Sequence, residues 1–484
     1  MNRSHHTAGA ALRVGVFLLL ASGLPRPGLA AQAAGPAPTG IAGITSAGIA
    51  RHIGVLADDS LLGRATPSHG LDAAAAYVAA ELRRAGLRPL AGGSLVVQWP
   101  LVTTHMVAGK IALEVGSASR LTYGEDFGVM RAGVPRISGR LLPVGDLTDT
   151  AAIRGRIPVL RLPPGDWSGP AHAAMFAARR ARATGLVLVL DSAQDAATVA
   201  TATAGMDHAS NGVPTALVSV AAARRLLRGP SAGEEISLAI PERTDTTYVP
   251  YVVGVLPGRD AGLRNEYVVL SAHLDHLGLR RSPDKGDSIY NGADDNASGV
   301  AALLETARAF AALGQRPRRS VIFFTPTAEE VCICGSEHFT RRPPVPVGAI
   351  IADVNLDGIG RSWQADTVSA VGSPYSTLGQ TVRVVAREHA ELGLTVVDDQ
   401  WPDRHYFTSS DQIWFARRGV PSIFLSSSGP DEHYHQVSDE AGTIEAEFTA
   451  RIARLGAWLV QAVAEDDARP RWDEPSRRSF EIAR

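Results

Sequence analysis

The chain has 484 residues, of which 45% are hydrophobic and 20% are charged, and its formal net charge is -2 at pH 7. This length and composition are typical of a globular protein with two or three domains. Because the charge is close to neutral, neither nucleic acid nor an anionic membrane surface is expected as a partner.

Residues 1–30 are predicted to be a signal peptide. Arg3 and Arg13 precede a short apolar run at 14–20, and small residues follow as far as Ala30. This is the layout of a secretory signal, and the run is shorter than the roughly 20 residues that span a bilayer. We therefore expect a secreted or periplasmic protein without a stable membrane anchor. Residues 31–47, rich in Ala, Gly and Pro, predict a flexible leader.

Two sections of different character follow the leader. The section 48–106 has a helix pattern at 71–84 and a strand pattern at 95–102. The section 107–243 has no cluster of His, Asp and Glu, and predicts a separate, non-catalytic α/β domain inserted into the main one. Its short strand candidates lie at 108–115, 157–162, 186–190 and 214–219, and its helix candidates lie at 171–184 and 220–227.

From residue 244 to residue 466, strand and helix patterns alternate. This alternation predicts an α/β domain with a mostly parallel central sheet and helices on both faces. The polar residues 467–484 predict a frayed tail. The strand candidates lie at 267–272, 320–326, 349–357 and 420–427, and the helix candidates lie at 300–313 and 444–463.

Metal-ligand residue types stand at the ends of these four strands. Parallel strands bring their carboxyl ends to one edge of a sheet, where ligands bind. Imidazoles and carboxylates together suit zinc, and this number of them suits two ions that share a carboxylate, roughly 3.5–4 Å apart. The residues are His273, the pair Glu329 and Glu330, Asp357, and His433 and His435 on either side of Tyr434, with Asp294 and Asp295 in the loop before residue 300.

Five motifs in chain order give the sequence a resemblance to a known family. HLDHLG, GADDNASG, TAEE…GSEHF, NLDGIG and YHQVSD resemble the motifs of the co-catalytic zinc aminopeptidases. That family includes secreted bacterial aminopeptidases, glutamate carboxypeptidase and, as a single-zinc relative, glutaminyl cyclase. The resemblance covers about 48–105 and 245–465, and the section 107–243 resembles a protease-associated domain. It implies an exported zinc metallopeptidase with two Zn²⁺ per chain that acts on a peptide or small amide.

The resemblance also implies roles for the metal ligands. His273 and Asp357 would hold one zinc, and Glu330 and His435 would hold the other. Asp295 would bridge the two ions, and its peptide bond to Asn296 would be cis. Asp294 is the alternative bridge, and His433 is the alternative to His435.

Three further residues have implied catalytic roles. Glu329 would be the general base that takes a proton from the attacking water. The carboxylate of Asp275 would accept a hydrogen bond from the imidazole of His273 and fix its tautomer. Tyr434 resembles the tyrosine that hydrogen-bonds the developing oxyanion.

The sequence leaves the direction of cleavage open. Gln412 replaces a histidine that is common in the family near the substrate pocket, and Tyr406 and Phe407 are candidates to line that pocket. Arg404 is a candidate to bind a substrate carboxylate, which favours a carboxypeptidase or dipeptidase as the alternative to an aminopeptidase. Glutaminyl cyclase-like activity and a metal-free binding scaffold also stay open.

The two cysteines, Cys332 and Cys334, are interpreted as small apolar fillers. A disulfide between residues two apart would be strained.

Overall fold

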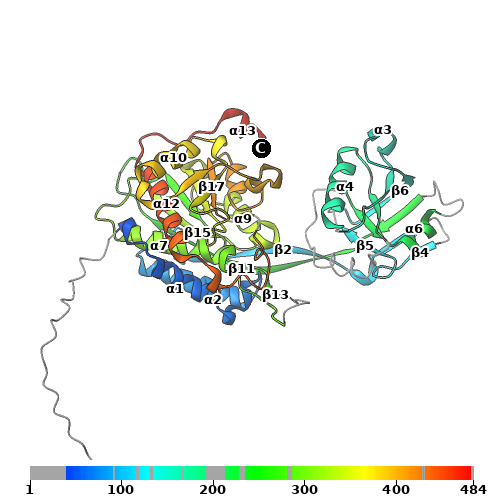
Figure 1. Ribbon diagram of the computed structural model, residues 1–484, viewed down its shortest axis with the longest axis horizontal. Helices are drawn as coiled ribbons and strands as arrows, with labels where there is room; N and C mark the ends of the chain where they lie inside the picture. Colours follow the sequence, from blue (N-terminus) through cyan, green and yellow to red (C-terminus); the bar gives the residue numbers. More distant parts are fainter. Residues whose placement is uncertain are drawn as a thin grey trace, which may run out of the picture. The chain divides into compact units, whose positions relative to one another are not determined.

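In the computed structural model, a nine-stranded mixed sheet forms the core of the part of the chain that contains α1 (Ser46–Leu56), α7 (Gly299–Ala311) and α12 (Ala446–Glu465) (Figure 1). The structure describes residues 40–90, 93–115, 119–130, 134–165, 167–191, 213–227, 235–280, 286–427, 429 and 431–480. The predicted signal peptide and the first part of the leader lie outside these residues. The strand order is β1-β11-β15-β12-β16-β19-β17-β18, with β2 paired to β11. The bounds are β1 Arg88–Pro89, β2 Val96–Met106, β11 Glu242–Leu256, β12 Tyr267–Ser271, β15 Ser320–Thr325, β16 Ile350–Leu356, β17 Thr367–Val371, β18 Thr395–Val397 and β19 Ser422–Ser426.

The four central strands, β15, β12, β16 and β19, are parallel to one another. The outer strands β11 and β17 run antiparallel to their neighbours β15 and β19. The prediction of an α/β fold is confirmed, and the parallel arrangement holds in the middle of the sheet, where all four strand ends predicted to carry ligands are found.

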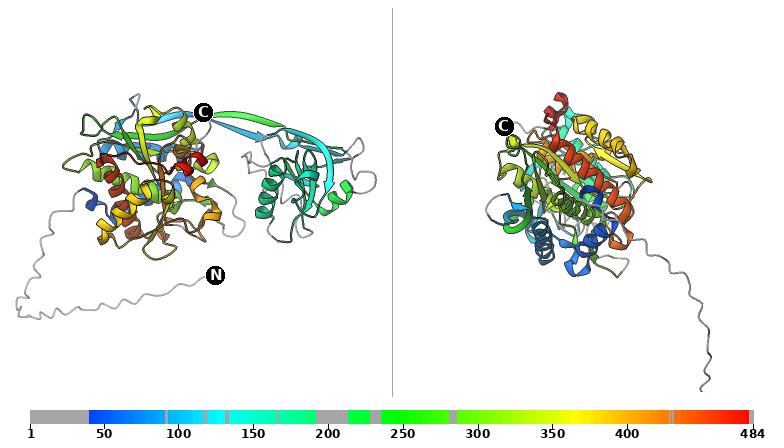
Figure 2. Two further views of the ribbon diagram at one scale, coloured as in Figure 1. Left: turned by 90° about the horizontal axis from the view of Figure 1, so that it is seen from above. Right: turned by 90° about the vertical axis from the view of Figure 1, so that its left-hand side faces the viewer.

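Both faces of the large sheet are covered by helices, and the side chains of the strands alternate between two cores. On β12, Val268 and Leu270 belong to one core while Val269 belongs to the other. Figure 2 shows these helices around the sheet from two further directions. The first core includes residues of α1 (Ser46–Leu56), α2 (His69–Arg84), α7 (Gly299–Ala311), α10 (Leu378–Glu388) and α12 (Ala446–Glu465), and the second includes residues of α9 (Cys334–Arg341) and α11 (Gln412–Ala416).

A second sheet of eight strands is formed entirely by residues between β2 and β11, in the order β4-β3-β10-β6-β7-β8-β9-β5. It has two apolar cores of its own. The strands are β3 Ala112–Val115, β4 Ser119–Leu121, β5 Phe127–Met130, β6 Arg136–Pro143, β7 Ile157–Arg161, β8 Leu186–Val189, β9 Thr215–Val218 and β10 Glu235–Ala239, and the helices are α3 Thr150–Ile153, α4 Ser168–Arg180 and α6 Val220–Leu227. The assignment of this insert to the protease-associated domains stays a prediction.

The structure corrects the predicted end of the flexible leader at residue 47. Ile41 and Ile44 are buried in the main core, and α1 begins at Ser46. The side chain of Thr45 accepts a hydrogen bond from Gly48 N, which caps the helix. The packed part of the chain therefore begins before residue 48.

The prediction of a frayed polar tail is also wrong, because two aromatic side chains anchor residues 472–480. Trp472 Nε1 donates to Gly419 O at 3.0 Å. The ring of Phe480, the last residue of α13 (Glu474–Phe480), lies 4.8 Å from the ring of Phe407. Residues 467–484 are mostly polar, and the two aromatic residues are eight positions apart, so the sequence showed no apolar pattern that predicts this packing.

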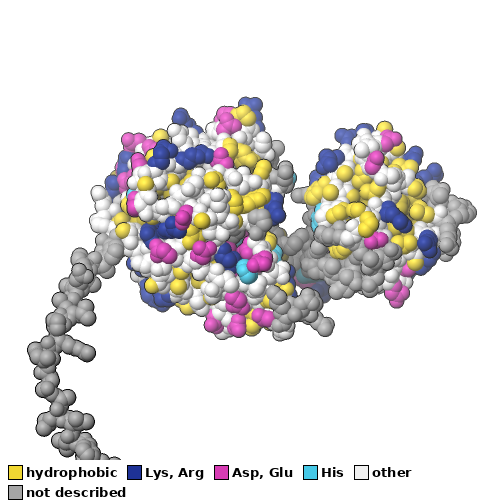
Figure 3. Space-filling view, in the orientation of Figure 1, with side chains coloured by type: hydrophobic (Ala, Val, Ile, Leu, Met, Phe, Trp, Pro, Cys, Tyr) yellow, Lys and Arg dark blue, Asp and Glu magenta, His cyan; other side chains and the backbone are white. Residues whose placement is uncertain are grey.

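Basic and acidic side chains are interspersed over the face of the protein drawn in Figure 3, as the small net charge leads one to expect. Among the residues that the structure describes, no helix is both long enough and apolar enough to cross a membrane.

Candidate active site

The four central strands are parallel, so they end at one edge of the sheet and deliver the predicted ligands there. His273 stands two residues after β12, and Asp357 follows β16 directly. Glu329 begins the short helix α8 (Glu329–Cys332), which follows β15. His435 belongs to the loop after β19. Residues separated by up to 162 positions therefore meet because their strands are parallel neighbours.

The fifth predicted ligand, Asp295, is held by the irregular turn η5 (Ala293–Ser298) at the start of α7. The main-chain amides of Asp294 and Asp295 donate to the two carboxylate oxygens of Asp439 at 2.9 and 3.2 Å. The peptide bond between Asp295 and Asn296 is cis, which confirms the prediction. Asn296 Nδ2 donates to Leu356 O at 2.9 Å, so the turn is tied to the end of β16.

Asp295 lies between the two histidines. Its Oδ1 is 3.2 Å from His273 Nε2, and its Oδ2 is 3.2 Å from His435 Nε2. On the first side, His273 Nε2 is 3.3 Å from Asp357 Oδ1. On the second side, His435 Nε2 is 3.2 Å from Glu330 Oε2. The five side chains therefore form two groups that share Asp295.

These distances fit zinc. Ligand atoms about 2.0–2.1 Å from a tetrahedral zinc lie about 3.4 Å from one another. All four measured pairs, at 3.2–3.3 Å, are close to that edge length. Each group supplies one imidazole and two carboxylates, a donor set that suits zinc. A further imidazole, that of His276, lies close to Asp295 and Glu330, and the sequence analysis did not select it.

Asp294 and His433, the two alternative ligands, have other partners. Asp294 Oδ1 accepts a hydrogen bond from Gly360 N at 2.5 Å, and its Oδ2 lies 3.5 Å from Arg361. His433 Nδ1 is 2.9 Å from Ser438 Oγ. The positions of Asp295 and His435 between the remaining candidate ligands make them the better candidates.

Burial and opposing charges shift the pKa values of the clustered groups. Burial lowers the pKa of His273, but the negative charges of Asp357 and Glu329 outweigh burial. The pKa of His273 therefore lies well above its ordinary value. Burial raises the pKa of Glu329 well above its ordinary value, and the nearby Glu330 adds to this rise. The pKa of Asp295 is lowered well below its ordinary value, because contacts with His276, His273 and His435 outweigh burial. The site thus collects buried negative charge, which divalent cations would neutralise.

The structure corrects the predicted contact of Asp275. His273 Nδ1 lies 3.1 Å from the main-chain oxygen of Asp275, whereas the carboxylate oxygen is 3.9 Å away. The carboxylate instead accepts hydrogen bonds from Thr66 Oγ1 at 2.9 Å and from Glu329 N at 3.2 Å. Burial raises the pKa of Asp275 to about 6. Its side chain therefore orients the turn that carries Glu329 and Glu330.

Tyr434 lies beside the cluster with 56% of its surface exposed. Its ring stacks on that of His435, with centroids 3.9 Å apart, and it lines the adjoining cavity. This position is compatible with contact to a substrate. The oxyanion role stays a prediction.

The site is supported by Arg64, Thr66 and Ser410, none of which stands in a motif that indicated a functional role. The buried Arg64 donates to Leu274 O, Asn291 O and Gly292 O at 2.7–3.0 Å, and burial lowers its pKa to about 10. Thr66 Oγ1 also accepts from Ala328 N at 3.2 Å. Ser410 Oγ donates to Asp357 Oδ2 at 2.8 Å. The available signal was an arginine in the GRATP stretch, which precedes the predicted helix at 71–84.

Cys332 and Cys334 form a disulfide, so their interpretation as apolar fillers is wrong. Their Cα atoms are 5.0 Å apart, within the usual range for such bridges. The bridge closes a loop that begins two residues after Glu330.

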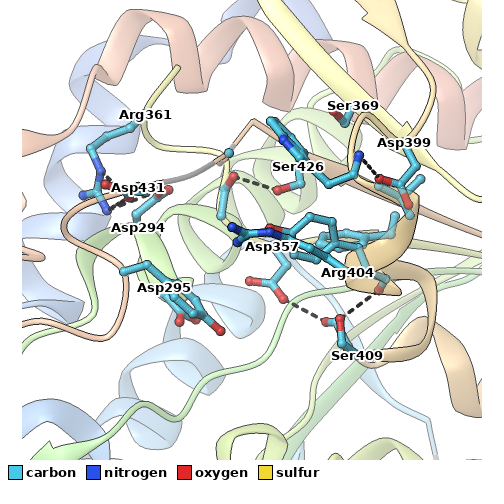
Figure 4. Close-up of a pocket in the computed structure, with 18 of the residues that line it drawn as sticks. Asp294, Asp295, Asp357, Arg361, Ser369, Asp399, Arg404, Ser409, Ser426 and Asp431 are labelled. Atoms are coloured by element: carbon cyan, nitrogen blue, oxygen red, sulfur yellow. Dashed lines mark hydrogen bonds and ion pairs between the residues drawn. The ribbon is translucent and has the colours of Figure 1, made fainter. Parts of the chain in front are cut away.

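A cavity of about 500 Å³ opens beside the cluster (Figure 4). This volume is typical of a small-molecule site. Its walls combine aromatic, aliphatic, hydroxyl and charged side chains, among them Val371, Trp401, Arg404, Tyr406, Phe424 and Ser426.

Two residues that we associated with the pocket support it from behind. Phe407 is buried in an apolar cluster and does not line the cavity, whereas its neighbour Tyr406 does. The buried Gln412 donates from Nε2 to Phe407 O at 3.0 Å and accepts from Asn355 Nδ2 at 2.8 Å. Gln412 therefore fixes the turn that presents Tyr406.

Comparisons with known proteins show which sequences and folds this chain resembles. Residues 251–460 match the model of Peptidase family M28. Aminopeptidase NAALADL1 from Mus musculus is 34% identical over 114 residues, and its homologue from Rattus norvegicus gives the same figures. The matched segment is 23% of this chain and spans only 13% of the length of these curated relatives.

Solved structures show the same fold. The aminopeptidase from Aneurinibacillus sp. strain AM-1 superimposes with a TM-score of 0.55 at 17% identity, covering 88% of this chain and 98% of that one. The zinc aminopeptidase BSAP from Bacillus subtilis gives a TM-score of 0.51 at 16% identity, covering 88% and 97%. Residues 251–460, which include every clustered ligand, are therefore similar to Peptidase family M28, and the chain has the fold seen in the zinc aminopeptidase structures.

Proposed function

We propose that the protein is a two-zinc peptidase that removes residues from the amino end of peptides. The observation that carries this proposal is the position of Asp295, 3.2 Å from an imidazole on each side. His273 and Asp357 would hold one zinc, Glu330 and His435 the other, and Asp295 would bridge them. The family match supports a zinc-dependent hydrolase.

Zinc bound in such a pair lowers the pKa of a bound water and polarises the scissile carbonyl. Glu329 Oε2 lies 4.0 Å from His273 Nε2, farther than the 3.2–3.3 Å between the candidate ligands, and its side chain lines the adjoining cavity. Its carboxylate accepts the proton of the attacking water and passes it to the nitrogen of the leaving amine. The hydrogen bond from Glu329 N to Asp275 holds the base in place.

The same cavity supports a second candidate, cleavage from the carboxyl end. Arg404 lines the cavity, and its Nη1 lies 3.3 Å from the hydroxyl of Tyr406, so the guanidinium keeps further donors for a substrate carboxylate. The relatives found by sequence and by fold are aminopeptidases by name, which favours the first candidate.

The direction of cleavage is tested with three forms of one tripeptide, with both ends free, the amino end acetylated, or the carboxyl end amidated. An aminopeptidase cleaves the free peptide and the amidated peptide but does not cleave the acetylated peptide. A carboxypeptidase shows the reverse pattern, with Arg404→Gln impairing cleavage. Cyclisation of an amino-terminal glutamine would indicate glutaminyl cyclase-like activity, and no zinc uptake or turnover would leave a binding scaffold.

The location and the insert complete the proposal. The predicted signal peptide supports a secreted or periplasmic enzyme. Cell fractionation should find the protein outside the cytoplasm, and sequencing of its amino terminus should show cleavage after Ala30 or Ala33. Accumulation of the full-length chain in the cytoplasm would contradict this prediction. The resemblance of 107–243 to a protease-associated domain supports an accessory role for the insert in reaching the substrate.

A further inference from the structure

His276 is a buried histidine beside the second group of candidate ligands, and the proposed function gives it no role. Its side chain is 1% exposed. Its Nδ1 lies 2.6 Å from Glu330 Oε1 and 3.7 Å from Asp295 Oδ2. Proximity alone would allow this imidazole either to bind a metal ion or to hold one of the ligands.

The distances distinguish these two roles. Two ligands of one tetrahedral zinc keep their donor atoms about 3.4 Å apart. His435 Nε2 has this spacing to both Asp295 Oδ2 and Glu330 Oε2, at 3.2 Å each. The 2.6 Å between His276 Nδ1 and Glu330 Oε1 is much shorter, and it lies just below the about 2.7–2.9 Å of charge-assisted hydrogen bonds from nitrogen to a carboxylate. His435 therefore has the geometry of a ligand, and His276 has that of a hydrogen-bond partner.

The surroundings hold the His276 ring in this orientation. A Cβ atom added to Gly292 would lie 2.5 Å from the ring, so the main chain packs directly against it. The ring of His435 approaches edge-on, with centroids 5.7 Å apart. His276 N donates to Arg64 O at 3.3 Å. Within the described part of the chain, Nε2 has no hydrogen-bond partner, so Glu330 is the side-chain partner that fixes this imidazole.

We propose that His276 is a positioning residue that donates its Nδ1 proton to Oε1 of Glu330 and so presents Oε2 alone to the zinc shared with His435 and Asp295. The inference rests on the proposed two-zinc function and deepens it. A carboxylate held at one oxygen keeps its orientation before the metal arrives, and loss of such a partner typically weakens metal binding 10- to 100-fold. The two zinc sites should therefore respond unequally to a change at His276.

The test compares two amide substitutions in the mature, full chain. In His276→Asn the amide nitrogen lies near the place of Nδ1 and can donate to Glu330. In His276→Gln it lies near the place of Nε2 and cannot. Each metal-free variant is titrated with Zn²⁺ in competition with a chromophoric chelator, which measures the two binding constants separately. His338→Asn is the matched control, because His338 is a partly buried histidine whose ring stacks on Trp99.

We expect His276→Gln to weaken one of the two zinc equivalents 10- to 100-fold and to leave the other within twofold of the wild type. His276→Asn should retain most of the affinity, and His338→Asn should bind both equivalents normally. Peptide cleavage at subsaturating zinc should follow the weaker equivalent, and saturating zinc should restore it. Circular dichroism of the metal-free variants checks the fold. If His276→Gln does not fold, His276→Leu, which also lacks a donor to Glu330, takes its place with the same expected weakening of one equivalent.

Two results would overturn the inference. Normal binding of both equivalents by His276→Gln would make His276 a packing residue. Complete loss of one equivalent in both amide variants would make it a ligand. Failure of the wild type to bind two zinc ions would instead refute the proposed function, so the two failures can be told apart.

Discussion

Glu305 offers a prediction of stability that can be worked out from the structure. This carboxylate on α7 is buried under the N-terminal helices. It lies 3.4 Å from His52 Nε2 on α1 and 2.7 Å from Arg308 Nη2. Burial alone would raise the pKa of Glu305, but the bonds from His52 and Arg308 outweigh it and lower the pKa to about 2. Substitution by Gln removes the charge and leaves the shape.

The magnitude follows from the difference between the folded and unfolded pKa values. A fall from 4.5 to about 2 corresponds to roughly 3 kcal/mol, because each unit is about 1.4 kcal/mol. The exposed arginine partners are screened by solvent, so we expect about 1–3 kcal/mol. Since the folded pKa is the lower one, this stabilisation is complete above pH 4.5. It is lost as the pH falls from 4.5 towards 2.

The assay is urea unfolding of the wild type and Glu305→Gln between pH 2.5 and pH 7. Chelator is present throughout, so that zinc release at low pH does not contribute. We expect Glu305→Gln to be less stable by about 1–3 kcal/mol above pH 5, with the difference shrinking below pH 4.5. Glu447→Gln, an exposed carboxylate on α12, is the control and should change stability by less than about 0.5 kcal/mol. A difference for Glu305→Gln that does not vary with pH would refute the reasoning.

Three further predictions concern the site. Glu329→Gln should lower kcat about 10²- to 10⁴-fold and leave zinc content unchanged in elemental analysis; loss of zinc would make it a ligand. Ser410→Ala frees Asp357 Oδ2 and should weaken one zinc equivalent about tenfold in chelator competition, whereas equal weakening of both would contradict this local role. Phe480→Ala removes the ring that packs on Phe407 behind the cavity, so KM should rise more than kcat falls in steady-state assays, and unchanged kinetics would contradict this support.

The strands and the ligands could be predicted because both follow local rules. Apolar runs such as 267–272 and 349–357 mark buried strands, and the residues after them lie at one edge of a parallel sheet. His273 and Asp357 lie close together because they follow β12 and β16, which are parallel neighbours in the sheet. The family resemblance then selected Asp295 over Asp294, and the structure places Asp295 between the histidines.

The supporting contacts could not be predicted, because they depend on packing between distant segments. Thr66 and Asp275 are separated by 209 positions, and no periodic pattern announces their hydrogen bond. His276 stands one residue after Asp275, yet only the three-dimensional structure shows its imidazole on Glu330. The packing of Trp472 and Phe480 was missed because the segment 467–484 as a whole is polar in composition.

The central claim is that Asp295 is shared by two zinc ions, and zinc content after substitution tests it most directly. The metal-free wild type, Asp295→Ala, Asp357→Ala and Glu330→Ala are each loaded with zinc, passed through a desalting column and analysed for zinc per chain. Two ions in the wild type, about one in Asp357→Ala and Glu330→Ala, and fewer than one in Asp295→Ala are the predicted results. An Asp295→Ala variant that keeps two ions, or a wild type that binds only one, would contradict the shared site.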